Sequence, residues 1–386
     1  MAAKTPSQRV RSLLPSADPI RFLAEDGSAV SAPAAYPMPA DELLVEAYRR
    51  MVLGRRFDTQ ATALTKQGRL AVYPSSRGQD ACQIAAAMAL REQDWLFPTY
   101  RDSVALVARG IDPVEVLTLL RGDWHCGYDP VARRVAPQCT PLATQVLHAT
   151  GMAEALRRKG EDSVALALVG DGGTSEGDFH EALNFAAVLR APVVFFVQNN
   201  KYAISVPLAR QTAAPSLAYK GIGYGVRSEQ IDGNDLAAVL SVLGAAAEYA
   251  RSGNGPMLVE AHTYRMDAHT NADDATRYRD AQEVERWRAA DPLDRLTAYL
   301  RDRGLLTDEI ADAASADAEV FAADLRTRMN ADTTPDPLEL FDHVFAEPTP
   351  QLREQRAQLA AELAAERQDE HQDERQDERQ EQEDRV

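Results

Sequence analysis

The chain has 386 residues, and 45% of them are hydrophobic, which is enough to bury the core of one large domain or of two smaller ones. Its formal net charge of −17 argues against nucleic acid as the main partner, because a protein that binds phosphate backbones needs a basic surface. The three cysteines form no CxxC pair and no even framework, which is typical of free thiols in a reducing compartment.

Residues 1–39 are rich in proline, alanine and serine and predict a mobile or wrapping arm. They carry basic residues but no apolar stretch of the kind found in secretory signals. Acidic residues at Asp18, Glu25 and Asp26 interrupt the acid-poor character of an organelle presequence. Since no later stretch is apolar over the length that spans a bilayer, we expect a cytoplasmic protein that does not enter a membrane.

Residues 40–350 predict an α/β domain in which helices flank a parallel sheet. Helices are expected over residues 40–68, 79–90, 144–159, 178–190 and after 235, and strands over 164–169, 192–197, 228–231 and 257–261. Residues 95–141 mix short helical pieces with loops, and a polar loop at 262–280 precedes further helices. Residues 351–386 repeat the sequence QDER and predict a charged helix or a disordered tail.

Two polar turns follow consecutive strands of this domain. The sequence GDGGTSEG occupies residues 170–177, and QNN occupies residues 198–200, each directly after an apolar run. With the helix between them these elements form one parallel βαβ unit, so Asp171 and Asn200 emerge at the same carboxyl edge of the sheet. A carboxylate and an amide oxygen beside a glycine turn and a helix N-terminus suit a divalent cation that bridges to a diphosphate.

Other interpretations of the glycine turn fit less well. By itself, GDGG also fits a tight turn in an ordinary α/β protein. A dinucleotide-binding oxidoreductase would need a third glycine at position 175, where the chain has Ser175, and no GxxxxGK[ST] phosphate loop is present. Two asparagines just beyond a buried strand contribute little to packing, which favours a functional site at this edge.

The stretch over residues 170–205 resembles the thiamine-diphosphate motif, in which GDG is followed at a distance by NN. More closely, residues 40–350 resemble the alpha subunit of the decarboxylating component of 2-oxo acid dehydrogenase complexes. The matching segments are RRMVLGRRFD, KQGRL, FPTYRD, TPLATQ, DGND and TYRMDAHTNADDATRYR. The resemblance implies the thiamine-diphosphate-binding fold, with this chain as its diphosphate-binding half.

The resemblance implies that Mg²⁺ is held by the side chains of Asp171 and Asn200 and by the backbone carbonyl of Tyr202. Gly172 and Gly173 would offer backbone N–H groups and space to the diphosphate, whose charge the metal and the helix N-terminus partly neutralise. The other residues implied to contact the cofactor are Tyr100, Arg101, Thr140, Leu142, Gln198 and His269.

Three of these residues carry specific expectations. The planar guanidinium group of Arg101 can bind two phosphate oxygens at once. Gln198 stands where some members of the family have an arginine, so one charged contact to the phosphate is in question. His269 occupies the position of the family's active-site histidine, and titration near neutrality suits a residue that stabilises or protonates the thiamine adduct. His125, in GDWHCG, is the second catalytic candidate, and Thr270 stands where some relatives carry a phosphorylated serine.

The segment TPLATQ matches a segment that contacts the cofactor and holds a structural K⁺ in branched-chain members of the family. Hydroxyl, carbonyl and amide oxygens suit such a cation. The K⁺ ligands that the match implies are Thr140, Pro141, Thr144 and Gln145. The alternative is an ordinary helix N-terminus, with Thr140 as its cap and Pro141 in the first turn.

The family resemblance also implies partners, because the carboxylate that helps to activate the cofactor's aminopyrimidine ring comes from a separate beta chain. We therefore expect an α2β2 heterotetramer, inactive as this chain alone, and a lipoyl-bearing acyltransferase component that receives the acyl group.

The substrate implied is a small 2-oxo acid. TPLATQ, SEGD, NNKYAIS and IGYG favour branched-chain acids such as 3-methyl-2-oxobutanoate, whereas KQGRL and GDGGTS are equally typical of pyruvate-type subunits. Residues 74–76 are expected to help line the substrate pocket. An acetoin-cleaving enzyme and a non-catalytic scaffold subunit are the alternatives.

Overall fold

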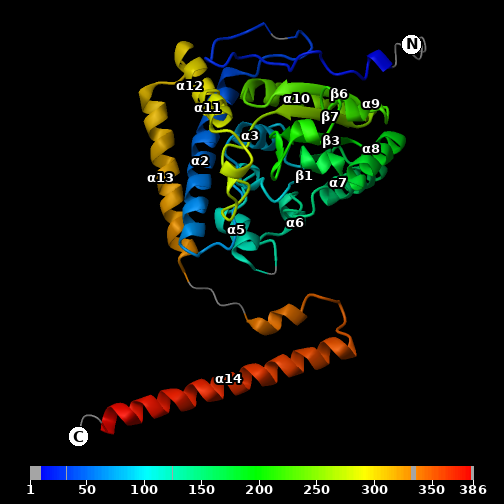
Figure 1. The fold of residues 1–386 in the computed structure, drawn as a ribbon. Helices are drawn as coiled ribbons and strands as arrows, with labels where there is room; N and C mark the ends of the chain where they lie inside the picture. The colour runs from blue at the N-terminus through cyan, green and yellow to red at the C-terminus, as the bar shows by residue number, and fades with distance from the viewer. Residues whose placement is uncertain (1–9, 32, 124, 332–335, 384–386) are drawn as a thin grey trace. The chain divides into compact units, whose positions relative to one another are not determined.

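The computed structural model describes residues 10–31, 33–123, 125–331 and 336–383, with side chains as far as residue 368. By its contacts the chain divides into two units, Met1–Asn330 and Ala331–Val386. The first unit contains a five-stranded parallel sheet with the order β1-β2-β3-β7-β6 (Figure 1), which confirms the predicted α/β fold. Its strands are β1 (Trp95–Phe97), β2 (Ala165–Gly170), β3 (Val193–Asn199), β6 (Arg227–Asp232) and β7 (Met257–His262).

Helices cover both faces of this sheet. They are α2 (Asp41–Lys66), α3 (Asp80–Met88), α4 (Ser103–Ala108), α5 (Pro113–Arg121), α6 (Pro130–Arg133), α7 (Thr144–Lys159), α8 (Gly177–Leu189), α9 (Tyr219–Ile222), α10 (Leu236–Tyr249), α11 (Ala281–Ala289), α12 (Pro292–Asp302) and α13 (Asp308–Met329). Side chains of β3 alternate between two buried clusters: Phe195 packs with α7 and α8, and Phe196 packs with α2, α3 and α10 on the other face. Because both faces are buried, the central strands β2 and β3 are continuous apolar runs over residues 165–169 and 193–197.

The N-termini of α10 and α7 are formed differently. Asp235 caps α10, since its side chain accepts a hydrogen bond from the N–H of Ala238 at 3.2 Å. Thr140 does not cap α7, and that interpretation is wrong: the helix begins at Thr144, and its N-cap residue is Ala143. The Gln145 side chain bonds the carbonyl of Leu142 at 3.3 Å, which ties the preceding residues into a bend outside the helix.

Strand β1 was not predicted from the sequence. It has three residues, too few to show a periodicity, and it exists because its backbone pairs with β2. The predicted strands and helices on either side of the glycine turn occur within one or two residues of their expected ends.

The N-terminal segment wraps around the edge of the sheet. Ile20 forms a parallel bridge with Ile231 of the edge strand β6, and the N–H of Ile20 bonds the carbonyl of Gln230 at 2.9 Å. The N–H groups of Phe22 and Leu23 then bond the carboxylate of Asp235 at 2.6 and 2.7 Å. These contacts pair backbone groups that an edge strand would otherwise leave exposed.

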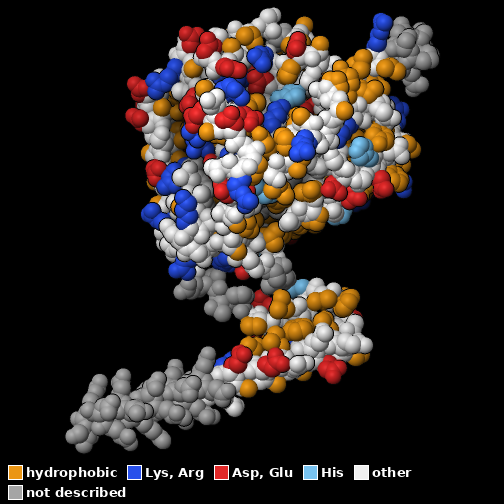
Figure 2. Space-filling view, viewed as in Figure 1, with side chains coloured by type: hydrophobic (Ala, Val, Ile, Leu, Met, Phe, Trp, Pro, Cys, Tyr) orange, Lys and Arg blue, Asp and Glu red, His pale blue; other side chains and the backbone are white. Residues whose placement is uncertain are grey.

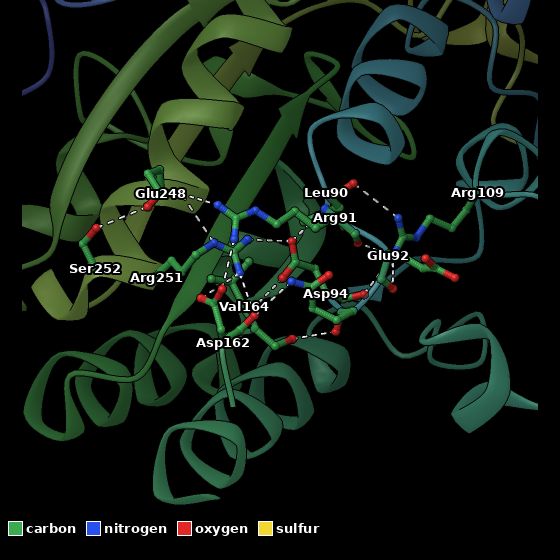
Figure 3. A network of polar contacts seen from close by, with 12 residues as sticks. Leu90, Arg91, Glu92, Asp94, Arg109, Asp162, Val164, Glu248, Arg251 and Ser252 are labelled. Atoms are coloured by element: carbon green, nitrogen blue, oxygen red, sulfur yellow. Dashed lines mark hydrogen bonds and ion pairs between the residues drawn. The ribbon is translucent and has the colours of Figure 1, made fainter. Parts of the chain in front are cut away.

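A network of polar contacts braces the amino edge of the sheet (Figure 3). The carboxylate of Asp94 is fully buried; its Oδ2 accepts from Arg251 Nη2 at 2.7 Å and from the N–H of Arg91 at 2.8 Å. Its Oδ1 accepts from the N–H of Val164 at 2.9 Å. One side chain therefore links the starts of β1 and β2 to the turn that follows α10.

The second unit contains a 3-10 turn, η5 (Pro337–Phe341), and the long helix α14 (Pro350–Glu383). Of the two states predicted for the QDER tail, the charged helix is the one observed. Among the described helices, none combines the length and the apolar character needed to cross a bilayer. Acidic and basic side chains are interspersed over the face of the first unit drawn in Figure 2, unlike the basic stripe of a nucleic-acid-binding surface.

Candidate functional site

A cavity of about 490 Å³ opens at the carboxyl edge of the sheet, where β2 and β3 end. It is lined by Gln79, Thr99, Tyr100, Arg101, Leu142, Gly170, Asp171, Gly172, Gly173, Ser175, Glu176, Gln198, Asn200, Tyr202, Ala203, Ile204, Val206, Arg210, Gln211, Arg265 and His269. Every residue expected to contact the cofactor is in this lining except Thr140. His125, Pro141, Thr144 and Gln145 lie outside it.

Asp171 and Asn200 meet at the floor of this cavity. The N–H of Asn200 bonds Asp171 Oδ1 at 3.3 Å, and both side chains are buried. Asn200 Nδ2 donates to Gln79 Oε1 at 2.8 Å, which fixes the orientation of the amide and leaves Asn200 Oδ1 beside the N–H of Tyr202 at 3.2 Å. The βαβ geometry thus brings a carboxylate and an amide oxygen together, as two turns at one sheet edge should.

The chemistry of this pair fits a divalent cation. Asp171 is 1% exposed, burial raises the pKa of its carboxyl group, and the side chain that donates to its carboxylate is the neutral amide of Gln211. The described part of the chain has no cluster of three or more His, Cys, Asp or Glu side chains that could hold a metal. A cation here would therefore depend on amide, backbone and phosphate oxygens as well, which is how Mg²⁺ binds when it accompanies a phosphorylated ligand.

Close packing requires glycine at two positions of the turn after β2. A Cβ atom at position 172 would lie 2.7 Å from the Cβ of Ala203, which belongs to the small hairpin of β4 (Tyr202–Ala203) and β5 (Val206–Pro207). A Cβ atom at position 173 would lie 2.8 Å from the carbonyl oxygen of Leu142. Packing of the protein against itself is thus a reason for Gly172 and Gly173, beside the space for a ligand that the sequence suggested.

Both ends of the Gln198 side-chain amide form hydrogen bonds with other side chains of this protein. Its Oε1 accepts from Gln79 Nε2 at 3.1 Å, and its Nε2 donates to Asp102 Oδ1 at 2.7 Å. The other oxygen of Asp102 accepts from the N–H and the hydroxyl group of Thr99, both at 2.7 Å. This chain of bonds runs from Asn200 through Gln79 to the turn after β1, so Gln198 holds the cavity floor together. Gln79 was missed because nothing in the sequence places the start of α3 at this edge.

Two guanidinium groups face His269. Arg101 Nη2 lies 3.0 Å from His269 Nδ1 and 2.9 Å from its carbonyl oxygen, and Arg101 Nη1 donates to the carbonyl of Ser75 at 3.0 Å. Arg265 Nη1 lies 3.4 Å from the same Nδ1 and donates to the carbonyl of Tyr202 at 3.3 Å. Arg265 is buried and was missed, although it follows strand β7 and so belongs to the same carboxyl edge.

His269 differs from the expectation of a group that titrates near neutrality. Burial and the neighbouring Arg101 lower its pKa from the ordinary 6.5 to about 4. Because a guanidinium group can only donate, Nδ1 is the acceptor and the proton of the neutral ring is on Nε2. The arrangement therefore presents a neutral N–H donor, which suits the first of the two expected roles, stabilising the adduct, better than the second, protonating it.

This assignment predicts a neutral His269 throughout the physiological range. A histidine whose folded pKa lies below its unfolded value favours folding above about pH 6.5 and loses that contribution as the pH falls toward 4. In ¹⁵N-histidine-labelled protein, the His269 resonances are those that disappear in the H269N variant. They should show an Nε2–H tautomer from pH 5.5 to 8. The Arg101→Met substitution should raise the pKa of His269. A midpoint near 6.5 in the unchanged protein would contradict the assignment.

Residues 74–76 support the cavity from behind, and none of them lines it. Ser75 Oγ lies 2.7 Å from Asp58 Oδ2 and 2.7 Å from Asp267 Oδ2. A hydroxyl group has one proton, so Ser75 can donate to only one of these two carboxyl groups at a time, and burial raises the pKa of Asp58 to about 6. This contact ties the loop that holds His269 to helix α2. In this chain residues 74–76 therefore support the cavity, and their place in a substrate pocket shared with a beta chain stays a prediction.

Among the five sequence candidates outside the cavity lining, His125 and Gln145 have informative contacts. His125 is exposed in the loop after α5, where its Nδ1 accepts from the N–H of Gly127 at 3.0 Å. Gln145 is buried at the start of α7; its Nε2 donates to the carbonyls of Leu142 and Leu168, and its Oε1 has no partner. Because both partners are carbonyl groups, which only accept hydrogen bonds, the bonded end of the Gln145 amide must be its nitrogen. A buried acceptor is thus left without a donor in the segment where K⁺ ligands were expected.

Comparison with known proteins gives a consistent answer. The family described as "Dehydrogenase E1 component" matches residues 48–337. A protein of Mycobacterium tuberculosis (strain CDC 1551 / Oshkosh), "3-methyl-2-oxobutanoate dehydrogenase subunit alpha", is 46% identical over 355 residues, which cover 92% of this chain and 97% of that protein. "Pyruvate dehydrogenase E1 component subunit alpha" of Staphylococcus aureus (strain Mu50 / ATCC 700699) is 40% identical over 304 residues, which cover 77% of this chain and 82% of the other. The chain belongs to the dehydrogenase E1 component family.

Proposed function

We propose that this chain is the alpha subunit of a 2-oxo acid dehydrogenase and binds Mg²⁺ and thiamine diphosphate in the cavity at the carboxyl edge. The observation that carries the proposal is the meeting of Asp171 and Asn200 beside the glycine turn, in a cavity that also contains Arg101 and His269. The bound cofactor would supply the electron sink for decarboxylation, and the protein binds and orients it and excludes water.

The residues divide into two groups by role. Asp171, Asn200 and the carbonyl of Tyr202 hold the metal, and the single long bond from Arg265 leaves that carbonyl a free lone pair. Gly172 and Gly173 place backbone against the diphosphate, with Tyr100, Arg101 and Leu142 on the other walls. His269 offers an N–H donor toward the reacting end of the cofactor.

The cavity is also matched to the charge of a metal diphosphate. Arg101, Arg210 and Arg265 face Asp171 and Glu176, so the lining carries one more positive than negative charge while His269 is neutral. A divalent cation bound to a diphosphate of charge −3 leaves one net negative charge, and the excess positive charge of the lining offsets it. We propose K⁺ as a structural ion at the nearby segment 140–145, with the unpartnered Gln145 Oε1 as the ligand that supports it.

A beta chain completes the site. The carboxylates that line this cavity, Asp171 and Glu176, both belong to the glycine turn at the diphosphate end. The carboxylate that activates the cofactor ring is thus proposed to come from the partner in an α2β2 assembly, which passes the acyl group to a lipoyl-bearing acyltransferase component. The exposed apolar side chains of Phe185 and Val188, both on α8, offer a docking surface.

The proposed substrate is a branched-chain 2-oxo acid, with pyruvate as the alternative. The higher identity and fuller coverage of the 3-methyl-2-oxobutanoate dehydrogenase subunit support the first. Discrimination between such acids depends on a few contacts worth roughly 1–3 kcal/mol, so overall likeness is a guide to substrate class only. The cytoplasm is the proposed compartment, supported by three cysteines that are all free.

Reconstitution tests the proposal. The chain co-expressed with a beta-type partner should decarboxylate 3-methyl-2-oxobutanoate with a higher kcat/KM than pyruvate or acetoin, by about 10-fold or more. The chain alone should have no activity on any of them. Activity of the isolated chain would contradict the split site, a preference for pyruvate or acetoin would replace the substrate assignment, and cofactor binding without turnover in the complex would favour a scaffold.

A further inference from the structure

Gln211 has an unusual position at the metal end of the cavity. It follows the short 3-10 turn η2 (Leu208–Arg210), which leads out of the β4–β5 hairpin, and its side chain reaches back to the glycine turn. Its Nε2 donates to Asp171 Oδ2 at 2.6 Å and to the carbonyl of Val206 at 3.0 Å. Because both partners are acceptors, the amide can have only one orientation.

That orientation leaves Gln211 Oε1 buried and without a hydrogen-bond partner. A buried acceptor that lacks a donor costs free energy, and such groups in native proteins generally await a water, an ion or a ligand. The residue lines the cavity, and the atom bonded to Asp171 and the unpartnered oxygen belong to one amide group. A group that donates a hydrogen bond to Gln211 Oε1 would therefore lie beside the Asp171 carboxylate.

The two oxygens of Asp171 are not equivalent as a result. Oδ2 has the short bond from Gln211, whereas Oδ1 has only the longer bond, 3.3 Å, from the N–H of Asn200. Oδ1 is thus the oxygen that remains open to a cation. Mg²⁺ bound through one carboxylate oxygen keeps several of its waters, and these waters are hydrogen-bond donors.

We propose that Gln211 is a further residue of the cation site, a positioning residue whose Nε2 holds Asp171 and whose Oε1 accepts a hydrogen bond from water bound to the cation. This inference rests on the proposed function of the cavity. Residues that orient metal ligands in this way typically change metal affinity by about 10–100-fold when removed.

The experiment measures cation affinity in the complex with the beta-type partner. Mn²⁺ binding is followed by electron paramagnetic resonance, and the Mg²⁺ concentration needed for half-maximal thiamine diphosphate binding by calorimetry. Gln211→Leu should weaken both by about 10–100-fold, because it removes the bond to Asp171 and the acceptor together. Gln211→Glu, which keeps an oxygen and adds a charge, should lose less than Gln211→Leu. Gln93→Leu, the same change at an exposed residue of the amino edge, should leave both values unchanged.

The outcomes separate the two proposals. If unchanged protein binds thiamine diphosphate with Mg²⁺ and Gln211→Leu binds the cation equally well, the role of Gln211 is overturned and the proposed function stands. Equal weakening in Gln211→Leu and Gln211→Glu would overturn the role of the oxygen. If the unchanged complex binds neither cation nor cofactor, the proposed function itself fails. The melting temperature without cation shows whether each variant is folded.

Discussion

Replacing Asp171 with alanine is expected to abolish Mg²⁺-dependent cofactor binding and to lower kcat/KM of the reconstituted complex by about a thousandfold or more. The carboxylate is the only charged group among the three proposed metal ligands, and a metal that neutralises phosphate charge contributes several kcal/mol, of which about 4 kcal/mol correspond to a thousandfold. The measurements are calorimetric binding of thiamine diphosphate with and without Mg²⁺, and steady-state rates on the 2-oxo acid.

Asp171→Asn separates loss of the cation from loss of the fold. Burial raises the pKa of Asp171, so the folded state binds its proton more tightly than the unfolded state does. Ionisation of this group at neutral pH therefore opposes folding, and the neutral asparagine should leave the cation-free protein as stable as before or more so. Its Mg²⁺ requirement should nevertheless rise steeply. A variant that unfolds, or one that binds Mg²⁺ normally, would contradict the role of Asp171.

The pairing of Asp171 with Asn200 was predictable because it depends on local rules. Two apolar runs with a helix between them form a parallel βαβ unit, and residues directly after such strands share one edge of the sheet. The C-terminal end of helix α7 also depends on a local rule, since Gly160 takes the left-handed conformation, with φ of 72°, that ends a helix.

Residues brought to the site by long-range packing were not predictable. The adjacency of β3 and β7, which puts Arg265 beside the carbonyl of Tyr202, joins strands separated by more than fifty residues, and no local pattern specifies that order. Gln79 and Gln211 reach the site from the ends of other elements. Long-range contacts also decide chemistry: the guanidinium group of Arg101, which is 168 residues from His269 in the sequence, lies at its Nδ1 and helps to keep the ring neutral.

Asp94→Ala is expected to lower the free energy of unfolding by about 3–5 kcal/mol, because it removes the buried partner of Arg251 and leaves that side chain with the longer contacts to Asp162 and Glu248, which are 69% and 57% exposed. The Arg251 side chain is 6% exposed, and the Asp94 side chain is fully buried. The variant also removes the acceptors of the N–H groups of Arg91 and Val164. Urea unfolding of the full chain, followed by circular dichroism, measures the loss.

Asp162→Ala is the matched control for this change. Asp162 also faces Arg251, at 3.6 Å, but its side chain is 69% exposed, and exposed ion pairs contribute about 0–1 kcal/mol. Equal stability of the two variants would show that burial of the Asp94 pair does not matter. Because Asp94 precedes β1 at the amino edge, Asp94→Ala should leave the Mg²⁺ affinity of the surviving folded protein unchanged. Asp94 and Asp171 are both buried acids, at opposite edges of one sheet. Replacing Asp94 should then lower the stability of the fold, whereas replacing Asp171 should lower the affinity for the cation.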